Sequence, residues 1–423
     1  MGFESELEKQ TDCLIPLGWH EITLGQLVTF HRGYDLPLKD KVEGKYPIVG
    51  SNGIIGYHDS FKIKGPGVAV GRSGNLGKPI FIKSDYWPHN TSLYVSEFHC
   101  SDPSFVYYFL KTLNLAEFNS GSAVPSLNRN HIHTMDVVVP KEIGEQEAIG
   151  RILSRLDSRI ELNKQMNGVL EAVGEAVFRR WFVDFEFPDG EGKPYRSSGG
   201  KMVYNKELDK EIPAEWSAKP IGKLVKINEN SINKEFTYSE IEYIDIDSVD
   251  EGFIKSRQIL QLSNAPSRAK RIVKNQDIII STVRPNLKHF AFIQGAKPNT
   301  IVSTGFVVLS PINTSTKLLY YHLTSDQYTN FLSAIADSHT STYPSFNPDI
   351  IQNSLIPYPT ETDDQGMAKT VFQFDSIVSG LFSKIHTNHE QISTLSQIRD
   401  LLLPRLMSGK IRVPVSKENE VFS

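Results

Sequence analysis

The 423-residue sequence has few of the features on which most enzyme sites and membrane anchors depend. It contains two cysteines, Cys13 and Cys100, which argues against a disulfide framework and against a cysteine-rich zinc site. No apolar run approaches the roughly 18 residues of a membrane span, and the N-terminal MGFESELEKQ lacks the apolar core of a signal peptide. We therefore expect a cytoplasmic protein built from ordinary globular domains.

A nucleotide-binding loop is also missing, although one glycine-rich stretch resembles it. GPGVAVGRSGNLGKP (65–79) contains a Gly-Lys pair, but Pro79 follows where a P-loop needs Ser or Thr. The first glycine of that motif should stand at Arg72. The spacing therefore argues against an NTPase, and the glycines need another explanation.

Candidate catalytic and metal-binding groups are scattered rather than assembled. The carboxylates of PDGEGK (188–193) lie in a Gly-rich turn that is typical of a solvated linker. NPDI (347–350) lacks the proline and aromatic residue that complete an amino-methyltransferase motif. The histidine pairs His131/His133 and His386/His389 have no nearby acidic or cysteine ligands, so we expect them to be exposed. The sequence predicts no catalytic residue and no metal site.

Net charge is also low, at −4, but the basic residues are unevenly distributed. Residues 60–84, the first basic block, contain five basic side chains and no acidic one. Residues 254–297, the second basic block, contain nine basic side chains and one acidic one. Two such blocks favour a polyanion-binding surface, whatever the total charge of the chain.

What the sequence does contain is an internal repeat. IPLGWHEITLGQLV (15–28) is echoed by IPAEWSAKPIGKLV (212–225), and NLGKPIFI (75–82) by NLKHFAFI (286–293). PSLN and PSFN recur later in the same order. The chain therefore reads as a duplication whose loops have diverged.

Each half follows the same local plan. Short β-rich runs separated by Gly, Pro and Asn turns are followed by a helix, which in the first half begins at Ser101 or Asp102 with Pro103 in its first turn. The pattern predicts two α+β domains. We place them at 1–144 and 213–362.

A long helix follows each domain. Apolar residues repeat every seven positions, with one asparagine in the middle layer: Ile149, Leu156, Asn163, Leu170 and Val177, then Phe374, Leu381, Asn388, Leu395 and Leu402. Five heptads predict a coiled coil, and a core asparagine sets its register. We expect the two helices, 145–184 and 363–412, to pair antiparallel in a pseudo-two-fold ring, with Asn163 bonded to Asn388. Residues 185–212 are expected to be a linker.

At this point the sequence resembles a known family. VVVPKEIGEQEAIGRIL (137–153), EIPAEW (211–216) and LLLPRLMSGKIRV (401–413) are similar to conserved regions of the specificity (S) subunits of type I restriction–modification systems. The resemblance extends over the whole chain. One departure is that the Pro…Glu-Gln signature containing Glu145 is degenerate before the second helix, where only Gln365 remains.

The resemblance implies a sequence-specific, non-catalytic subunit. Its two target-recognition domains would each read one half of a split sequence in double-stranded DNA, held apart by helices of roughly 50 Å. It implies partners, namely two modification (methyltransferase) subunits and restriction (motor-nuclease) subunits. S-adenosylmethionine, ATP and magnesium would bind to those partners, with no cofactor in this chain. The process implied is DNA methylation and restriction of foreign DNA.

Two loops in each half are the candidate DNA contacts, since Arg can read guanine, Asn adenine, and Lys a phosphate. The candidates are Arg72, Asn75, Lys78, Ser126, Asn128 and Arg129 in the first half, and Arg284, Asn286, Lys288, Tyr343 and Asn347 in the second. The leucines Leu156, Leu170, Leu381 and Leu395 are candidates for the helix register and subunit interface. A hairpin turn with surface charges stays possible for each loop residue.

Two other functions stay open at this point. One is a coiled-coil scaffold whose two domains bind a protein or carbohydrate ligand instead of DNA. The other is an enzyme with a fused nuclease or methyltransferase. Steep salt dependence of DNA binding by the assembled complex would favour the DNA-recognition subunit over the scaffold. Cofactor binding by the isolated chain would favour the enzyme.

Overall fold

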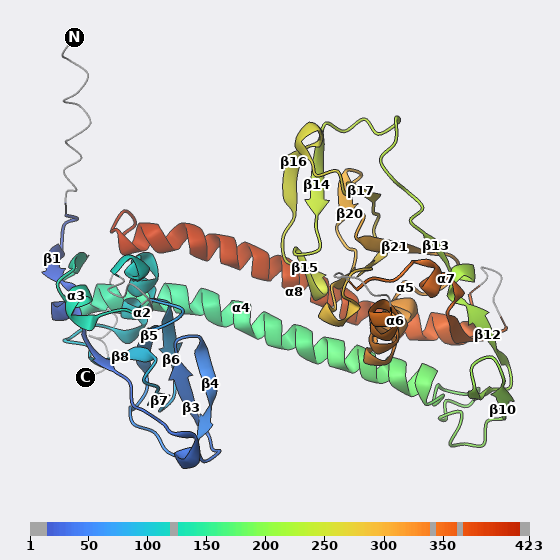
Figure 1. Cartoon of the computed structure of the whole chain (residues 1–423), viewed down its shortest axis with the longest axis horizontal. Coiled ribbons are helices and arrows are strands. Elements are labelled where there is room, and N and C mark those ends of the chain that lie inside the picture. Colours follow the sequence, from blue (N-terminus) through green and yellow to red (C-terminus); the bar gives the residue numbers. More distant parts are fainter. Residues whose placement is uncertain (1–14, 119–125, 339–343, 362–366, 415–423) are drawn as a thin grey trace, which may run out of the picture. The chain divides into compact units, whose positions relative to one another are not determined.

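The computed structural model describes residues 15–118, 126–338, 344–361 and 367–414 (Figure 1). The chain divides into two compact units, of which the first joins residues up to 164 with those from 389 onward, and the second comprises 165–388. Each unit contains one α+β domain. Each also contains part of two long helices, α4 (Ile143–Phe178) and α8 (Lys369–Met407).

The domain of the first unit begins and ends in one ladder. Strand β1 (Trp19–Thr23) pairs antiparallel with β9 (Asp136–Pro140), and Trp19 lies opposite Pro140. A four-stranded antiparallel sheet has the order β2 (Thr29–Arg32), β8 (Ser92–Glu97), β5 (Gly67–Gly71), β6 (Pro79–Ile82). A three-stranded sheet has the order β4 (Gly53–His58), β3 (Tyr46–Gly50), β7 (Trp87–Pro88).

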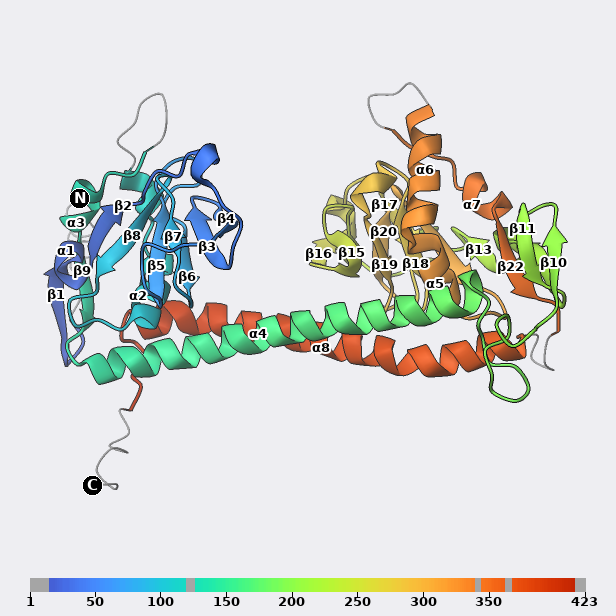
Figure 2. The ribbon, with the colours of Figure 1, turned by 90° about the horizontal axis from the view of Figure 1, so that it is seen from below.

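Short helices complete this domain: α1 (Leu24–Leu27), α2 (Pro103–Thr112) and α3 (Arg129–His133). The predicted start of α2 is confirmed, because Asp102 accepts the Phe105 N–H at 2.8 Å and Pro103 is the first helical residue. Tyr108 then donates a hydrogen bond to Asp157 of α4 at 2.6 Å. This bond ties the domain to α4 within the first unit. Figure 2 shows α2 on the side of its domain that faces the long helices.

The domain of the second unit repeats this plan. Strand β12 (Trp216–Pro220) pairs antiparallel with β22 (Leu355–Pro359), which places Trp216 opposite Pro359. A five-stranded sheet has the order β13 (Val225–Ile227), β21 (Phe306–Pro311), β18 (Ile278–Ser281), β19 (Phe290–Phe292), β15 (Val249–Ile254). A four-stranded sheet has the order β16 (Gln258–Gln261), β14 (Glu240–Ile244), β20 (Thr300–Ser303), β17 (Ala269–Ile272). The helices are α5 (Thr316–Thr324), α6 (Asp326–Ser338) and α7 (Asp349–Asn353).

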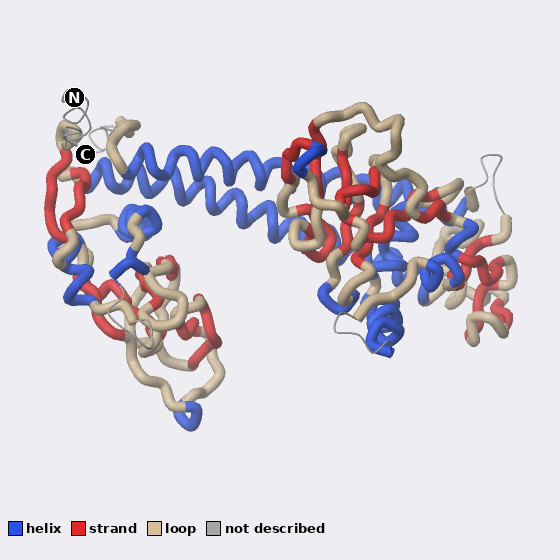
Figure 3. Tube along the Cα trace, turned by 45° about the horizontal axis from the view of Figure 1, so that its top comes forward, coloured by secondary structure: helices blue, strands red, loops and turns tan. Residues whose placement is uncertain are grey.

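The two domains therefore share a strand order. The series β2, β8, β5, β6 corresponds to β13, β21, β18, β19, and the parallel pair β3–β7 corresponds to β14–β20. The second domain adds β15 and β17 at sheet edges. The internal repeat read from the sequence is thus a repeat of fold, and the α+β prediction is confirmed. Figure 3 shows the strands and helices of each domain by type.

The segment expected to be a linker, 185–212, packs on the second domain. Phe185 and Phe187 lie against the Trp216 ring, with ring centroids 5.5 and 5.2 Å away. Strands β10 (Met202–Asn205) and β11 (Lys210–Pro213) form an antiparallel pair in its second part. Aromatic burial thus anchors the chain directly after α4.

The long helices pair antiparallel within each unit, as predicted. In the first unit Asp157 contacts Arg399 at 2.8 Å and Asn163 contacts Gln391 at 3.1 Å. Residue numbers therefore rise along α4 where they fall along α8, so the two helices run in opposite directions. In the second unit Asn388 donates to Asn167 at 2.7 Å, while the Phe178 ring packs near Phe374, with centroids 6.5 Å apart. Both hydrogen-bonded amide contacts lie between the helices.

The predicted hydrogen bond between Asn163 and Asn388 is wrong. The Asn163 amide donates to Gln391, and the Asn388 amide donates to Asn167. Asn167 lies about one helical turn beyond Asn163 on α4. The physical reason is a stagger: a seven-residue repeat fixes which face is buried, and it does not fix how far one helix slides along the other.

Only some of the residues in the predicted seven-residue register are buried. Leu156, Leu170, Leu381 and Leu395 are half-buried, whereas Leu153 and Ile160 are buried. Leu153 and Ile160 lie on a neighbouring stripe of α4, which faces both the domain and the partner helix. A two-helix pair leaves its outer positions accessible, so the half-buried leucines keep exposed edges.

Candidate nucleic-acid interface

The two candidate loops of the first domain are joined by backbone hydrogen bonds. Ser73 forms an antiparallel bridge with Ser126, and Leu127 N–H donates to the Arg72 carbonyl at 2.9 Å. Arg72 N–H in turn donates to the Thr91 carbonyl at 2.9 Å. Residues 72–78 and 126–129 therefore form one surface, which we call the first reading surface.

The side chains of the first reading surface differ in how far they reach solvent. Asn75 and Lys78 are exposed, while Arg72, Ser126, Asn128 and Arg129 are half-buried. The loop closes on itself through Gly77 N–H, which donates to the Gly71 carbonyl at 2.8 Å. A closed loop with exposed Asn and Lys tips is suited to contact a nucleic acid.

The glycines of this loop, which the nucleotide-binding motif did not explain, have two different roles. A Cβ at Gly71 would lie 1.8 Å from the Asn75 carbonyl oxygen, and a Cβ at Gly77 would lie 2.7 Å from Leu115 Cβ. These two glycines therefore serve internal packing instead of giving a polyanion access to the backbone. Gly74 has φ +79° with open space around it, so it alone of the three fits a loop tip.

The second domain builds an equivalent surface. Val283 forms an antiparallel bridge with Ser345, Arg284 N–H donates to the Pro344 carbonyl at 2.9 Å, and Phe346 N–H donates to Thr282 at 3.1 Å. Residues 284–288 and 344–347 together form what we call the second reading surface. Tyr343, which was expected to contribute, lies outside the described residues.

Two of the predicted asparagines accept local hydrogen bonds at helix starts, where Asn128 is the N-cap of α3 and Asn347 directly precedes Pro348, the N-cap of α7. The Asn128 side chain accepts the Asn130 N–H at 3.0 Å at the start of α3, and the Asn347 side chain accepts the Asp349 N–H at 3.1 Å at the start of α7. Each carboxamide oxygen is thus occupied locally. Only the amide donor of each side chain stays available for a ligand.

The basic blocks differ in how much of their charge is compensated. In the described part of the chain, Lys78 and Arg72 of the first basic block form no ion pair. In the second basic block, Lys288 lies 2.7 Å from Glu251 and 2.9 Å from Asp326, and these hydrogen bonds raise its pKa. The charge of Lys288 is therefore largely balanced by its own domain.

Glu242 neutralises two more cations of the second basic block. It accepts from Arg257 at 2.9 Å and from Lys297 at 3.2 Å, and Thr300 donates to it at 2.8 Å. Burial alone would raise its pKa, but the Thr300 hydrogen bond and the Arg257 charge hold the pKa below its usual value. These cations support the fold of the second domain.

Two further cations of the second basic block, which the comparison of the two candidate loops missed, lie at the same end of the second domain as the second reading surface. Arg268 and Lys270 are exposed, and neither is ion-paired among the described residues. The Arg268 carbonyl accepts Thr304 N–H at 2.8 Å, and the next residue, Gly305, accepts Thr282 N–H at 2.9 Å. The charge block contained the signal for both, but only the backbone hydrogen bonds through Thr304 and Gly305 connect Arg268 to Thr282, which precedes the second reading surface.

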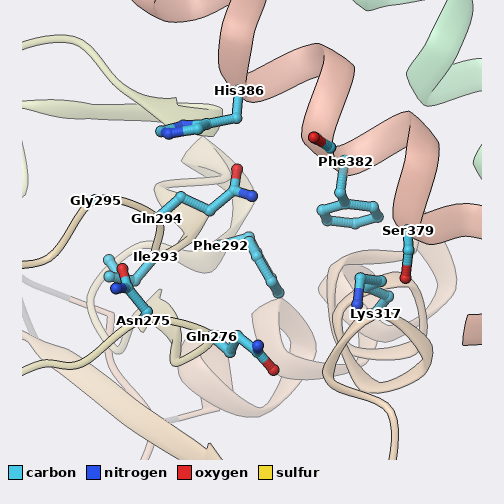
Figure 4. A pocket seen from close by; sticks show the side chains of 11 residues that line it. Asn275, Gln276, Phe292, Ile293, Gln294, Gly295, Lys317, Ser379, Phe382 and His386 are labelled. Atoms are coloured by element: carbon cyan, nitrogen blue, oxygen red, sulfur yellow. The ribbon is translucent and has the colours of Figure 1, made fainter.

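A separate pocket of about 340 Å³ lies at the other end of the β18–β19 hairpin (Figure 4). Asn275, Gln276 and Gln294 line it from the strand side, and Phe382 and His386 line it from α8. Its lysine, Lys317, is held 3.2 Å from Asp375 of α8. The pocket is therefore rich in neutral amides and does not belong to either reading surface.

The histidine pairs were expected to be exposed, which holds for His131 and is wrong for His133, His386 and His389, all of which are half-buried. His133 is half-buried, and its Nε2 accepts the Phe30 N–H at 2.9 Å. Burial lowers its pKa, which favours the neutral ring that this acceptor role requires. Among the residues described, no group of three or more His, Cys, Asp or Glu side chains has an arrangement that could hold a metal ion.

Glu145, in the first turn of α4, holds other segments of the first unit together. Its carboxylate accepts from Arg412 at 2.7 and 2.9 Å and from Trp19 Nε1 at 3.4 Å. The matching segment before α8, which includes Gln365, lies outside the described residues. The contact that the sequence singled out therefore joins the C-terminal segment to the first domain.

The comparisons with known proteins agree with this duplicated architecture. The sequence matches the family described as "Type I restriction modification DNA specificity domain" twice, over residues 16–172 and 213–391. The chain belongs to this specificity family. The two matches each take in one domain and the first part of the helix that follows it, as the repeat predicts.

Individual relatives of the specificity family are moderately similar. The MjaIX specificity subunit of Methanocaldococcus jannaschii is 28% identical over 321 residues, covering 73% of this chain and 69% of that protein. The HindI specificity subunit of Haemophilus influenzae is 24% identical, covering 70% of this chain and 73% of that protein. The crystal structure of the S subunit from M. genitalium has a TM-score of 0.63 at 17% identity, covering 92% of this chain and 96% of that one. Among the described helices, none has the length and apolar character needed to span a bilayer.

Proposed function

We propose that this protein is the specificity subunit of a type I restriction–modification complex, in which each domain reads one half of a split DNA sequence. The observation that carries the proposal is the pair of reading surfaces. They occupy the same place in two domains of the same strand order, yet present different side chains. Two readers on one fold, with divergent tips, are what a bipartite target requires.

The proposed reading contacts follow from exposure and charge. In the first domain Asn75 and Lys78 are exposed, and Arg72 is held by its backbone beside them. In the second domain Arg284 and Asn286 are exposed, and so are Arg268, just before β17, and Lys270 within β17. We assign the lysines to phosphates, and Arg284 and the asparagines to base edges.

The modification subunits are proposed to dock on the long helices. In the second unit, Met166, Val169 and Val173 of α4 follow a three–four spacing, and Val169 and Val173 are 64% and 45% exposed. These residues differ from Asn167 and Phe178, which contact α8, and the exposed apolar seam fits an apolar helix of a partner. Restriction subunits are proposed to join the same assembly.

The chain itself is proposed to be non-catalytic and to work in the cytoplasm. S-adenosylmethionine, ATP and magnesium would then be bound by the partner subunits. The purified chain should show no stoichiometric S-adenosylmethionine binding by calorimetry, whereas the complex with modification subunits should bind it. Binding by the isolated chain would contradict this assignment.

DNA recognition is tested with the complex of this chain and its modification subunits. The genomic sites that the complex methylates define the bipartite target, and a duplex carrying that target gives the affinity. We expect a Lys78→Ala/Asn75→Ala variant to weaken binding while the complex still assembles. Lys164→Glu, which lies on the other side of α4 from the apolar seam, should leave assembly intact, whereas Val169→Glu should abolish it. A complex that assembles but methylates DNA without a bipartite preference would contradict the proposal.

A further inference from the structure

The second reading surface presents an apolar side chain at its tip. Leu287 is 49% exposed, and it ends the single turn of 3-10 helix formed by Pro285–Leu287. Arg284 and Asn286, both exposed, stand beside it. A leucine in such a position contributes little to the core of its own domain.

The loop holds this tip in a fixed conformation. Arg284 and Lys288, on either side of the turn, both adopt left-handed backbone conformations, with φ 48° and 55°. Non-glycine residues adopt this conformation at a cost, and they keep it only where the surroundings enforce it. Here the two ion pairs of Lys288 and the backbone bond from Arg284 to Pro344 enforce it. The leucine is thus displayed by a loop that is already ordered.

The internal repeat supplies a natural comparison. In the aligned segments NLGKPIFI and NLKHFAFI, Leu287 corresponds to Leu76. Leu76 is half-buried and packs against the core of the first domain, while Leu287 points to solvent. The same residue type therefore supports the fold in one domain and is presented outward in the other.

We propose that Leu287 is a specificity-determining residue that contacts the C5-methyl group of a thymine in the half-site read by the second domain. This inference rests on the proposed function. The thymine methyl is the apolar group that the major-groove edges of the bases display, and apolar side chains recognise it. Arg284 and Asn286 beside Leu287 supply hydrogen-bond donors for the neighbouring base edges of the same groove.

The test removes the methyl group from the DNA and the side chain from the protein. The complex with modification subunits is titrated with duplexes in which each thymine of the target is replaced in turn by deoxyuridine. We expect one replacement in the second half-site to weaken binding of the unchanged complex about three- to tenfold, the effect of one buried methyl group with its neighbours. Leu287→Ala should weaken binding to the thymine duplex by a similar factor and should no longer respond to that deoxyuridine.

The controls separate this inference from the proposed function. Leu76→Ala should lower the unfolding midpoint of the protein in urea, whereas Leu287→Ala should leave the midpoint unchanged. The inference is overturned if no deoxyuridine in the second half-site matters, if that half-site has no thymine on either strand, or if Leu287→Ala weakens thymine and deoxyuridine duplexes equally, as a wedge between base pairs would. If the unchanged complex shows no sequence preference at all, the proposed function fails instead.

Discussion

Arg412 and Glu145, which are 267 positions apart in the sequence, form a two-pronged ion pair. The Arg412 Nε lies 2.7 Å from one carboxylate oxygen of Glu145, and a terminal nitrogen lies 2.9 Å from the other. The Glu145 side chain is almost fully buried, and Trp19 donates to it as well. The C-terminal segment is therefore part of the first unit.

This ion pair predicts that the C-terminal segment stabilises the first domain. Arg412→Ala should lower the thermal unfolding temperature of the protein, because it leaves the buried Glu145 carboxylate without its cation. Arg412→Lys should recover only part of the loss, since lysine cannot make two parallel bonds to one carboxylate. Scanning calorimetry of the three proteins measures this. Equal unfolding temperatures would show that the pair contributes nothing.

The amide pair between the long helices in the second unit predicts a non-additive pair of substitutions. Asn388 is fully buried and Asn167 nearly so, and one hydrogen bond joins their side-chain amides. Asn388→Leu should destabilise the second unit by about 1–3 kcal/mol, because the Asn167 amide is then buried without a partner. Replacing both residues by leucine should restore or raise stability.

Urea unfolding of the two single variants and the double variant gives the coupling energy of the amide pair. Asn163 and Gln391, which form the corresponding contact in the first unit, serve as a matched second pair. Additive losses in the double leucine variant would contradict a direct amide contact.

The difference in charge compensation predicts different salt dependence for two lysines. Lys78 is exposed and unpaired within the described residues, so Lys78→Ala should lower the slope of log affinity against log salt by about 0.9. Lys288 is bound to Glu251 and Asp326, so Lys288→Ala should leave the slope unchanged. Fluorescence anisotropy of the assembled complex between about 50 and 200 mM salt makes the comparison. A loss of slope in the Lys288 variant would show that its ion pairs open on DNA.

A half-buried histidine, whose Nε2 is shielded from solvent, predicts how the second domain responds to acid. Burial and the nearby Lys210 charge lower the pKa of His322 from 6.5 to about 4, and its Nε2 has no hydrogen-bond partner among the described residues. Because the folded-state pKa is depressed, the unfolded chain binds the proton first, and stability falls as pH drops from 6.5 toward 4. The loss should be about 1 kcal/mol at pH 5.5 relative to pH 8.

The matched variant for this pH effect is His322→Phe, which keeps an aromatic ring beside Tyr328 and cannot titrate. Its urea midpoint should change less between the two pH values than that of the unchanged protein. Identical pH profiles for both proteins would show that another group is responsible.

Local sequence signals predicted the elements of this fold well. The capping residue Asp102, the paired tryptophans Trp19 and Trp216, and the heptads of the long helices all act within a few residues of each other or repeat along the chain. Each of these signals led to the correct element. Repetition also led to the correct pairing of candidate loops, because the same strands carry them in both domains.

Features that depend on distant residues could not be predicted from the sequence. Lys288 stays a predicted DNA contact, but its loop gave no sign of the ion pairs with Glu251 and Asp326, from β15 and α6. The sequence left Gly71 and Gly77 unexplained, and close contacts with Asn75 and Leu115 within the fold require them. The heptad pattern also contains no information on how far the long helices slide relative to each other.

The central claim is that each domain reads one half of a bipartite DNA target. The direct test replaces residues 216–360 by the equivalent domain of a relative with a different target, and maps methylated sites across the genome of a host that carries the complex. We predict that one half of the recognised sequence changes to that of the relative and the other half stays the same. A recognised sequence in which both halves change, or neither does, would contradict the account.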